Sequence, residues 1–281
     1  MRSLFLSMGA AAMLTAACQS KQKPVAPPPP PASMTIHAKD YSFDAPNEVS
    51  AGVTTVHLVN DGPGLHHAIF VRLDSAKTVA DLLDALKKPG ALPAWALFAG
   101  GPNVPEPGTA SDATLDLAPG NYAIICILNM PGGVPHFMRG MVRPLTVTAA
   151  PATAAGTPKA VLPVADNMIT LIDYTFALAK PITTGTHTFQ VVTALGQPHE
   201  VLVVRLNAGK TGQQYVDWIQ SMRGPAPGRA MGGTAAAAAG VAQLFTITFE
   251  PGDYLLICLV PDAKNGKLHF MNGMMQVVTV K

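Results

Sequence analysis

The sequence predicts an all-β protein made of two tandem β-sandwich domains, each with a short helical insert. Short β-branched or alternating runs, bounded by Gly, Pro, Asn or Asp, recur along the chain, which is typical of the strands of a sandwich. Four blocks of sequence also occur twice, about 132 or 133 residues apart. A repeat at a fixed distance indicates a tandem duplication, so the two halves should share one fold.

Length and composition limit the function. The 281 residues allow two domains of ordinary size, and 48% hydrophobic residues against 13% charged ones can fill two cores. The net charge of +2 is small and the chain has no run of Lys and Arg, so no nucleic-acid partner is expected. Local sites, rather than the overall charge, should therefore carry the function.

The N-terminus predicts export and a lipid anchor. A basic start and a short apolar run are typical of a signal peptide over residues 1–17, and Leu14–Cys18 resembles a bacterial lipobox. The resemblance implies cleavage before Cys18 and lipidation of its thiol, although a plain signal peptide with an incidental cysteine is the alternative. Residues 18–33 would form a proline-rich linker. We expect a protein of the bacterial cell envelope, anchored in a membrane and facing the periplasm or the exterior.

The four repeated blocks set the domain limits at 34–149 and 165–281, joined by a linker over 150–164. The paired blocks are 40–43 (DYSF) with 173–176 (DYTF), 65–73 (LHHAIFVRL) with 198–206 (PHEVLVVRL), 117–128 (LAPGNYAIICIL) with 249–260 (FEPGDYLLICLV), and 136–147 (HFMRGMVRPLTV) with 269–280 (HFMNGMMQVVTV).

Within the first repeat most signals are β. The predicted strands are 53–59, 68–73, 113–117, 122–128 and 142–148. One segment, 78–88, instead places apolar residues at helical spacing and stops at a Pro-Gly pair, and its counterpart is 212–222. We expect the Gly- and Ala-rich segment 230–241 to be mobile.

Each repeat ends with a set of metal-ligating residues. A strand ends in Cys126 or Cys258, and after nine or ten intervening residues a His and a Met, with four residues between them, open the next strand. A thiolate, an imidazole and a thioether suit copper better than zinc, magnesium or calcium. Loops at one end of a sandwich cluster, so an upstream histidine can join each set. The candidate ligands are His66, Cys126, His136 and Met141 in the first repeat, and His199, Cys258, His269 and Met274 in the second.

Some ligand choices stay open at this point. His67 is a rival to His66, and Glu200 stands at its place in the second repeat. Met138 and Met271 are also duplicated and could replace the methionines chosen above. A disulfide between the two strand cysteines is not expected, because equivalent positions in two separate sandwiches should lie beyond disulfide reach.

At these residues the chain resembles the cupredoxin (blue copper, plastocyanin/azurin-like) family. The resemblance rests on Asn60 followed by His66, on PG-x-Y-x3-C, and on H-x4-M before a closing strand. It implies a Greek-key sandwich with copper near one end. The long Cys–His loop is similar to the type 1 loop of copper nitrite reductases. In those enzymes a His directly before the Cys serves a second copper, and here Ile125 and Ile257 stand there.

The sequence thus predicts up to two coppers per chain in type 1-like sites, which favours one-electron transfer to a redox partner. Copper storage or delivery, with a copper-handling protein as partner, is an alternative. A metal-free cupredoxin scaffold for protein binding is another. No pattern for a second copper, a Ser–His–Asp triad or paired carboxylates stands out, so we do not expect an enzyme.

Overall fold

A computed structural model describes residues 27–88, 90–129, 133–151 and 160–281. The expected signal peptide, the lipidation site Cys18 and part of each expected linker lie outside the described residues. The described chain is mostly β, with two α-helices and two short 3₁₀-helices, which confirms the predicted all-β class. The domain limits and linkers given above stay predictions.

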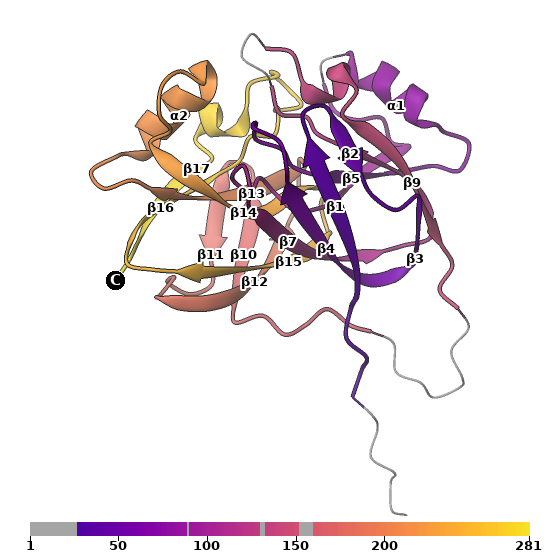
Figure 1. Ribbon diagram of the computed structural model, residues 1–281, viewed down its shortest axis with the longest axis horizontal. Helices are drawn as coiled ribbons and strands as arrows, with labels where there is room; N and C mark the ends of the chain where they lie inside the picture. Colours follow the sequence, from indigo (N-terminus) through magenta and orange to yellow (C-terminus); the bar gives the residue numbers. More distant parts are fainter. Residues whose placement is uncertain (1–26, 89, 130–132, 152–159) are drawn as a thin grey trace, which may run out of the picture.

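The strands form two large sheets that pack as layers (Figure 1). The first sheet has eight strands in the order β11 (Thr175–Leu178), β10 (Asn167–Ile172), β12 (Gly185–Thr193), β15 (Ala242–Phe249), β7 (Ala110–Leu117), β4 (Gly52–Asn60), β1 (Ala32–Lys39) and β2 (Ser42–Asp44). The second has nine in the order β17 (Met275–Val280), β16 (Gly252–Ile257), β13 (His199–Leu206), β14 (Gly228–Ala237), β6 (Ala96–Gly100), β5 (Ile69–Leu73), β8 (Gly120–Ile125), β9 (Val142–Thr148) and β3 (Glu48–Ser50).

Each sheet runs without interruption from the second repeat into the first. The joins are β15 with β7, through Leu244 and Thr114, and β14 with β6, through Ala237 and Ala99. Close to the second join, the buried side chain of Gln243 accepts a hydrogen bond from the N–H of Gly101 (2.9 Å). The two sandwiches are therefore fused edge to edge instead of being held only by the linker, and this fixes their metal-binding ends relative to each other.

The expectation that the segment 230–241 is mobile is wrong. It forms most of β14, a central strand of the nine-stranded sheet that pairs with β13 on one side and β6 on the other. Ala235, Ala236 and Ala237 are buried. Ala235 and Ala236 belong to a core that contains residues of both repeats, among them Val71 and Val203. Burial between neighbours, rather than β propensity, holds this strand.

Both predicted helices are confirmed, as α1 (Val79–Leu86) and α2 (Gly212–Ser221). Each begins with a capping box, in which the hydroxyl of Thr78 or Thr211 accepts a hydrogen bond from the backbone N–H three residues on. Among the described residues, neither helix has the length and apolar character needed to span a membrane.

Candidate metal centres

Each repeat brings one cysteine and two histidines together at the same end of its sandwich. His66, Cys126 and His136 form the first cluster, in which the three donor atoms lie within 4.8 Å of one another. The second cluster, within the same limit, contains His199, Cys258 and His269. All six residues are buried. Six of the eight predicted metal ligands are thus assembled in two matching groups.

The donor atoms in the two clusters are arranged alike. The Nδ1 atoms of His66 and His136 are 3.2 Å apart, and those of His199 and His269 are 3.0 Å apart. The sulfur of the cysteine is 3.5 Å from Nδ1 of the second histidine in the first centre and 3.4 Å in the second. Two imidazole nitrogens and one sulfur therefore converge on a common point in each repeat.

Backbone hydrogen bonds fix the cysteine between two parts of the same loop. Cys126 follows β8 directly; its N–H donates to the carbonyl of Met141 (3.2 Å), and its carbonyl accepts from the N–H of Phe137 (2.9 Å). Cys258, after β16, makes the same two bonds with Met274 (3.2 Å) and Phe270 (3.1 Å). The loop carrying the second histidine is thus tied to the cysteine at both of its backbone polar groups.

The prediction that the second histidine opens a strand is wrong. It opens a 3₁₀ turn instead. These turns are η1 (His136–Arg139) and η2 (His269–Asn272), and each is closed by a glycine with a φ of 103°. A left-handed φ is readily adopted only by glycine, so the H-x3-G-M spacing fixes where the turn ends. The methionine that follows the glycine is thereby placed next to the cysteine, whose N–H donates to its carbonyl.

Burial separates the two methionine candidates in each repeat. Met141 and Met274 are fully buried, and their N–H groups donate to the carbonyls of His136 (3.1 Å) and His269 (3.0 Å). Met138 and Met271 are 55% and 48% exposed. A thioether that faces solvent is a poor axial ligand for a buried centre. Burial therefore favours Met141 and Met274, as chosen from the spacing.

His67, the rival to His66, lies outside the first cluster although it is also buried. Glu200, at the equivalent position, uses Oε1 to accept a hydrogen bond from the N–H of Leu259 (3.0 Å), directly after Cys258. This position therefore borders each cluster without supplying a metal ligand to it.

A carboxylate orients the first histidine of each centre. Nε2 of His66 is 3.0 Å from Oδ1 of Asp40, and Nε2 of His199 is 2.8 Å from Oδ1 of Asp173. A hydrogen bond to a carboxylate places the proton on Nε2, so Nδ1 presents its lone pair to the cluster. The two aspartates open the repeated DYSF and DYTF blocks. The repeat marked these blocks in the sequence, but no pattern in them pointed to the role of the aspartates.

The tyrosines of the same blocks pack on the second histidine. The ring of Tyr41 meets His136 edge-on at a centroid distance of 5.4 Å, and Tyr174 meets His269 at 5.5 Å. Both tyrosines have a φ of 64°, in the left-handed region that non-glycine residues rarely adopt. Strained residues of this kind persist where the surroundings hold them, and here they form a wall of each centre.

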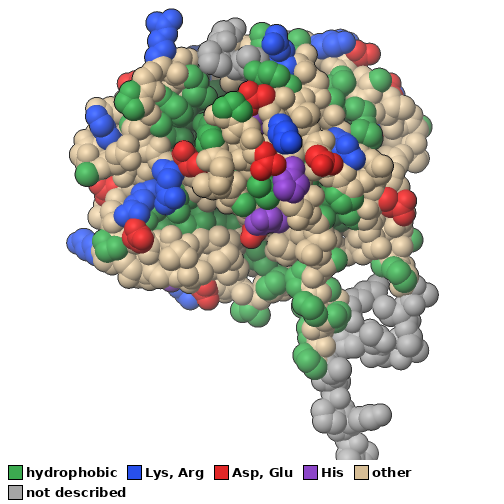
Figure 2. Space-filling view, viewed as in Figure 1, with side chains coloured by type: hydrophobic (Ala, Val, Ile, Leu, Met, Phe, Trp, Pro, Cys, Tyr) green, Lys and Arg blue, Asp and Glu red, His purple; other side chains and the backbone are tan. Residues whose placement is uncertain are grey.

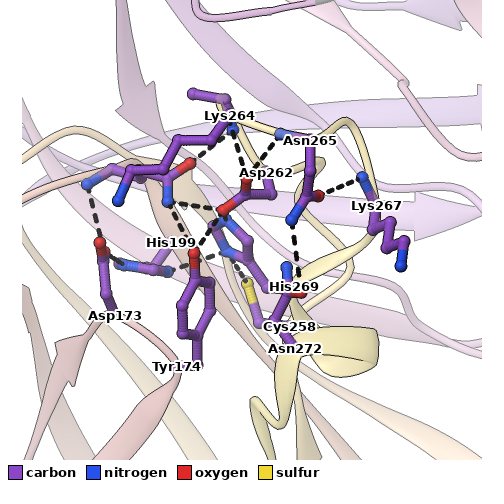
Figure 3. A network of polar contacts seen from close by, with 12 residues as sticks. Asp173, Tyr174, His199, Cys258, Asp262, Lys264, Asn265, Lys267, His269 and Asn272 are labelled. Carbon is purple, nitrogen blue, oxygen red and sulfur yellow. Dashed lines mark hydrogen bonds and ion pairs between the residues drawn. The ribbon is translucent and has the colours of Figure 1, made fainter.

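The second centre has a further polar network over His269 (Figure 3). The buried carboxylate of Asp262 accepts hydrogen bonds from the hydroxyl of Tyr174 (2.6 Å) and the side-chain amide of Gln197 (2.8 Å). These bonds, with those from the N–H groups of Lys264 and Asn265, hold the pKa of Asp262 well below its usual range. The carboxylate is therefore charged, and its Oδ2 lies 3.9 Å from Nε2 of His269.

The first repeat lacks the residues for this network. Counted from the cysteine, the place of Asp262 is taken by Met130, which lies outside the described residues. Counted from the first histidine, the place of Gln197 is taken by Gly64. His136 is 7% exposed, whereas His269 is completely covered. The two centres thus share their donors but differ in what lies over the second histidine.

Burial sets the protonation of the donors in the absence of metal. It lowers the pKa of all four histidines, to about 4 for His136 and His269, so the imidazoles are neutral at pH 7. It raises the pKa of the Cys126 thiol to about 12 and that of Cys258 further still. Neutral imidazoles are ready to bind a metal, and each thiol must first lose its proton.

The residues present fit copper, and one orphaned atom supports this. Nδ1 of His199 carries a lone pair, so the short Nδ1–Nδ1 contact requires a proton on Nδ1 of His269. Its buried Nε2 is then a bare lone pair without a hydrogen-bond partner in the described part of the chain, facing the Asp262 carboxylate. A metal at Nδ1 of His269 would move that proton to Nε2, where the carboxylate favours it. The donors, with the buried methionines, make two His–Cys–His–Met type 1-like copper sites.

Cys126 and Cys258 are both free, in agreement with the expectation that they do not pair. Their burial and the histidines beside them distinguish them from exposed reactive thiols.

We expect the replacement of Asp173 by Ala to weaken copper binding at the second centre by about 10–100-fold, the usual effect of losing a carboxylate behind a ligating histidine. The first centre, held by Asp40, is the internal control and should keep its affinity. Competition with a copper chelator, followed at each centre in chains that retain only one cysteine, measures both values. Equal affinities before and after the substitution would show that Asp173 does not position His199 for copper binding.

Known structures with some similarity to the chain include copper proteins. Auracyanin from the photosynthetic bacterium Roseiflexus castenholzii is 22% identical, over 44% of this chain and 100% of its own, with a TM-score of 0.28. The "blue" copper protein auracyanin A from Chloroflexus aurantiacus is 24% identical, over 42% and 99%, with a TM-score of 0.30. Copper nitrite reductase from Nitrosomonas europaea is 15% identical, over 89% and 94%, with a TM-score of 0.26.

Neither a protein-family model nor a curated protein matches the chain. The TM-scores above are low, so the assignment of the centres rests on the strand order and the donor geometry of this chain.

Proposed function

We propose that the protein is a copper-binding lipoprotein of the bacterial cell envelope that transfers single electrons through two type 1-like sites. The observation that carries the proposal is the pair of buried clusters, each with two facing Nδ1 atoms and one sulfur. Copper bound to a thiolate and two imidazoles supplies a one-electron couple between Cu(I) and Cu(II).

The residues around each cluster favour that role over other uses of a metal. Asp40 and Asp173 hold one imidazole, and backbone hydrogen bonds tie the cysteine to the loop of the other imidazole. Donors held in this way would change little between oxidation states, which favours fast electron transfer. Complete burial of the cysteines keeps water away from the sulfur.

A carrier is favoured over an enzyme. Within the described ranges, the two Cys–His–His clusters are the groups of ligand residues close enough to hold a metal. Ile125 and Ile257 precede the cysteines, so neither strand offers a histidine for a second copper. A partner would therefore be a redox protein or a copper-handling protein rather than a substrate.

The surface is compatible with a protein partner. On the face shown in Figure 2, Lys and Arg side chains are interspersed with Asp and Glu, without a patch of one sign.

We propose that lipidated Cys18 holds the domains at the membrane through the proline-rich residues 18–33. Mass spectrometry of the protein extracted from bacterial membranes would detect the lipid, and an unmodified or absent Cys18 would contradict the anchor.

The proposed electron transfer is tested by potentiometric titration of the copper-loaded chain. Both centres should be reduced and reoxidised reversibly, with one electron each. A chain that stays redox-silent but exchanges Cu(I) readily with a chelator would point to copper storage or delivery instead. Copper that leaves the unfolding temperature unchanged would favour the metal-free scaffold, because a ligand of the native state must stabilise it.

Copper binding should depend on pH through the cysteine thiols. The thiol of Cys126 has a pKa of about 12 and that of Cys258 lies higher, so each is protonated at neutral pH and releases a proton on binding. His136 and His269, with a pKa of about 4, stay neutral above pH 5. From pH 5 to 8 the apparent affinity should therefore rise about tenfold per pH unit at each site. Calorimetry in buffers of different ionisation enthalpy would measure one proton released per copper, and no release would contradict the thiolate ligand.

A further inference from the structure

The two metal centres share their ligands but differ in the charges around the second histidine. In the second centre the carboxylate of Asp262 faces Nε2 of His269 at 3.9 Å, and both side chains are buried (Figure 3). In the first centre the residue at the place of Asp262 is the uncharged Met130. Unequal charges beside matching ligands should make the two centres differ in their preference for Cu(I) and Cu(II).

Hydrogen bonds keep Asp262 in its charged form. Its Oδ2 accepts from the hydroxyl of Tyr174 (2.6 Å) and the side-chain amide of Gln197 (2.8 Å). Its Oδ1 accepts from the N–H groups of Lys264 and Asn265 (2.9 Å each). A carboxylate that accepts four hydrogen bonds is strongly favoured over the neutral acid. The second centre therefore has a buried negative charge beside one of its ligands.

The first centre has a cation instead. The guanidinium of Arg139 lies over the ring of Tyr41, with Cζ 5.3 Å from the ring centroid, and that ring packs on His136. The second repeat has the neutral Asn272 at the place of Arg139. Arg139 is exposed, so water and salt screen its charge, and its effect should be smaller than that of Asp262. Both differences act in the same direction.

Other charged groups near the centres do not reverse this difference. The aspartates behind the first histidines hold the two centres alike, so their effects are equal. Lys264 and Lys267 are exposed, where water screens their ammonium groups. The N–H of Glu200 is 3.5 Å from the sulfur of Cys258, so any negative charge on its side chain acts at the second centre in the same direction as Asp262.

Copper with the same ligands carries one more positive charge as Cu(II) than as Cu(I), so a nearby anion stabilises Cu(II) more. We propose that Asp262 gives the second centre the lower reduction potential, so that a single electron in the chain resides at the first centre. In that internal exchange the second centre is oxidised from Cu(I) to Cu(II), the first is reduced from Cu(II) to Cu(I), and no proton moves. The inference rests on the proposed one-electron function.

The test is a spectroelectrochemical titration of copper-loaded full chains that retain one site, with Cys258→Ser isolating the first centre and Cys126→Ser the second. The ratio of Cu(II) to Cu(I) affinity should be about tenfold higher at the second centre, as expected for a unit charge near a buried site, and its potential about 59 mV lower. Equal potentials, or the lower potential at the first centre, would overturn the proposal alone. Absence of bound copper from both chains would contradict the proposed function and this inference together.

Two variants of the chain that retains the second centre separate charge from structure. Asp262→Asn should lower the Cu(II) to Cu(I) affinity ratio about tenfold, mainly by weakening Cu(II), as competition with a chelator for each oxidation state would measure. Tyr174→Phe is the matched control, because it removes a hydrogen bond to the same carboxylate but keeps the charge and the ring on His269. It should change the ratio much less. An unchanged ratio in Asp262→Asn, or equal changes in the two variants, would overturn the role of the charge.

Discussion

Cys126→Ser and Cys258→Ser should each remove one of two coppers and about half of the thiolate-to-copper absorption, and the double variant should be colourless. The sulfur of each cysteine is one of the three donors of its own cluster, and no other described Cys, His, Asp or Glu belongs to that cluster. A serine hydroxyl is a hard, weakly acidic donor that does not replace a thiolate. Copper content and the visible spectrum of the three variants measure the effect.

The two single variants are each other's control. Both cysteines are free and fully buried at equivalent positions, so the structural cost of the substitution should be similar. Thermal unfolding of the metal-free variants checks this. A single variant that keeps the full spectrum would show that its repeat contributes no type 1-like site, and an unchanged double variant would exclude the cysteines as ligands.

Gly233→Ala should lower the free energy of unfolding by at least about 3 kcal/mol, since strain at a special φ and a steric clash combine there. An added Cβ would lie 2.1 Å from the backbone oxygen of Val201, at a φ of 125°. Gly233 belongs to β14 and pairs with Leu202 of β13, the strand that begins with His199. Relieving the clash must therefore move the strand of a proposed ligand.

Gly52→Ala is the matched control, because Gly52 has the same φ of 125° and no atom of the described residues lies within 4 Å of the added Cβ. It should cost only the backbone strain, about 1–3 kcal/mol. Denaturant unfolding of both metal-free variants gives the comparison. Equal losses would mean that β13 and β14 can separate freely at Gly233, which would contradict the close approach of Gly233 to Val201.

The clustered cysteines and histidines could be predicted from the sequence because a duplication makes their spacing recognisable. Cys126 and His136, with their copies 132 and 133 residues later, form a pattern that chance does not repeat. The capped helices follow equally local rules, since Thr78 and Thr211 each bond to a group three residues away. Features that depend on a few neighbouring residues are the ones that sequence alone predicts.

The fused sheets could not be found in this way. The pairing of Leu244 with Thr114 joins residues 130 positions apart, and the sequence of neither strand indicates which strand it pairs with. The strand β14 was not predicted for a related reason: its glycines and alanines have low β propensity, and burial holds them in the sheet. The repeat includes Asp40 and Asp173, but their role could not be predicted because it depends on histidines 26 residues away.

The most direct test of the two-site account is a titration of the purified metal-free full chain with Cu(II), followed by visible absorption and copper content. The account predicts an intense thiolate-to-copper band that grows until two coppers are bound per chain and then stops. One copper per chain would contradict equivalent binding by the two repeats. Absence of the band, with no tight binding of copper in either oxidation state, would contradict the type 1-like centres altogether.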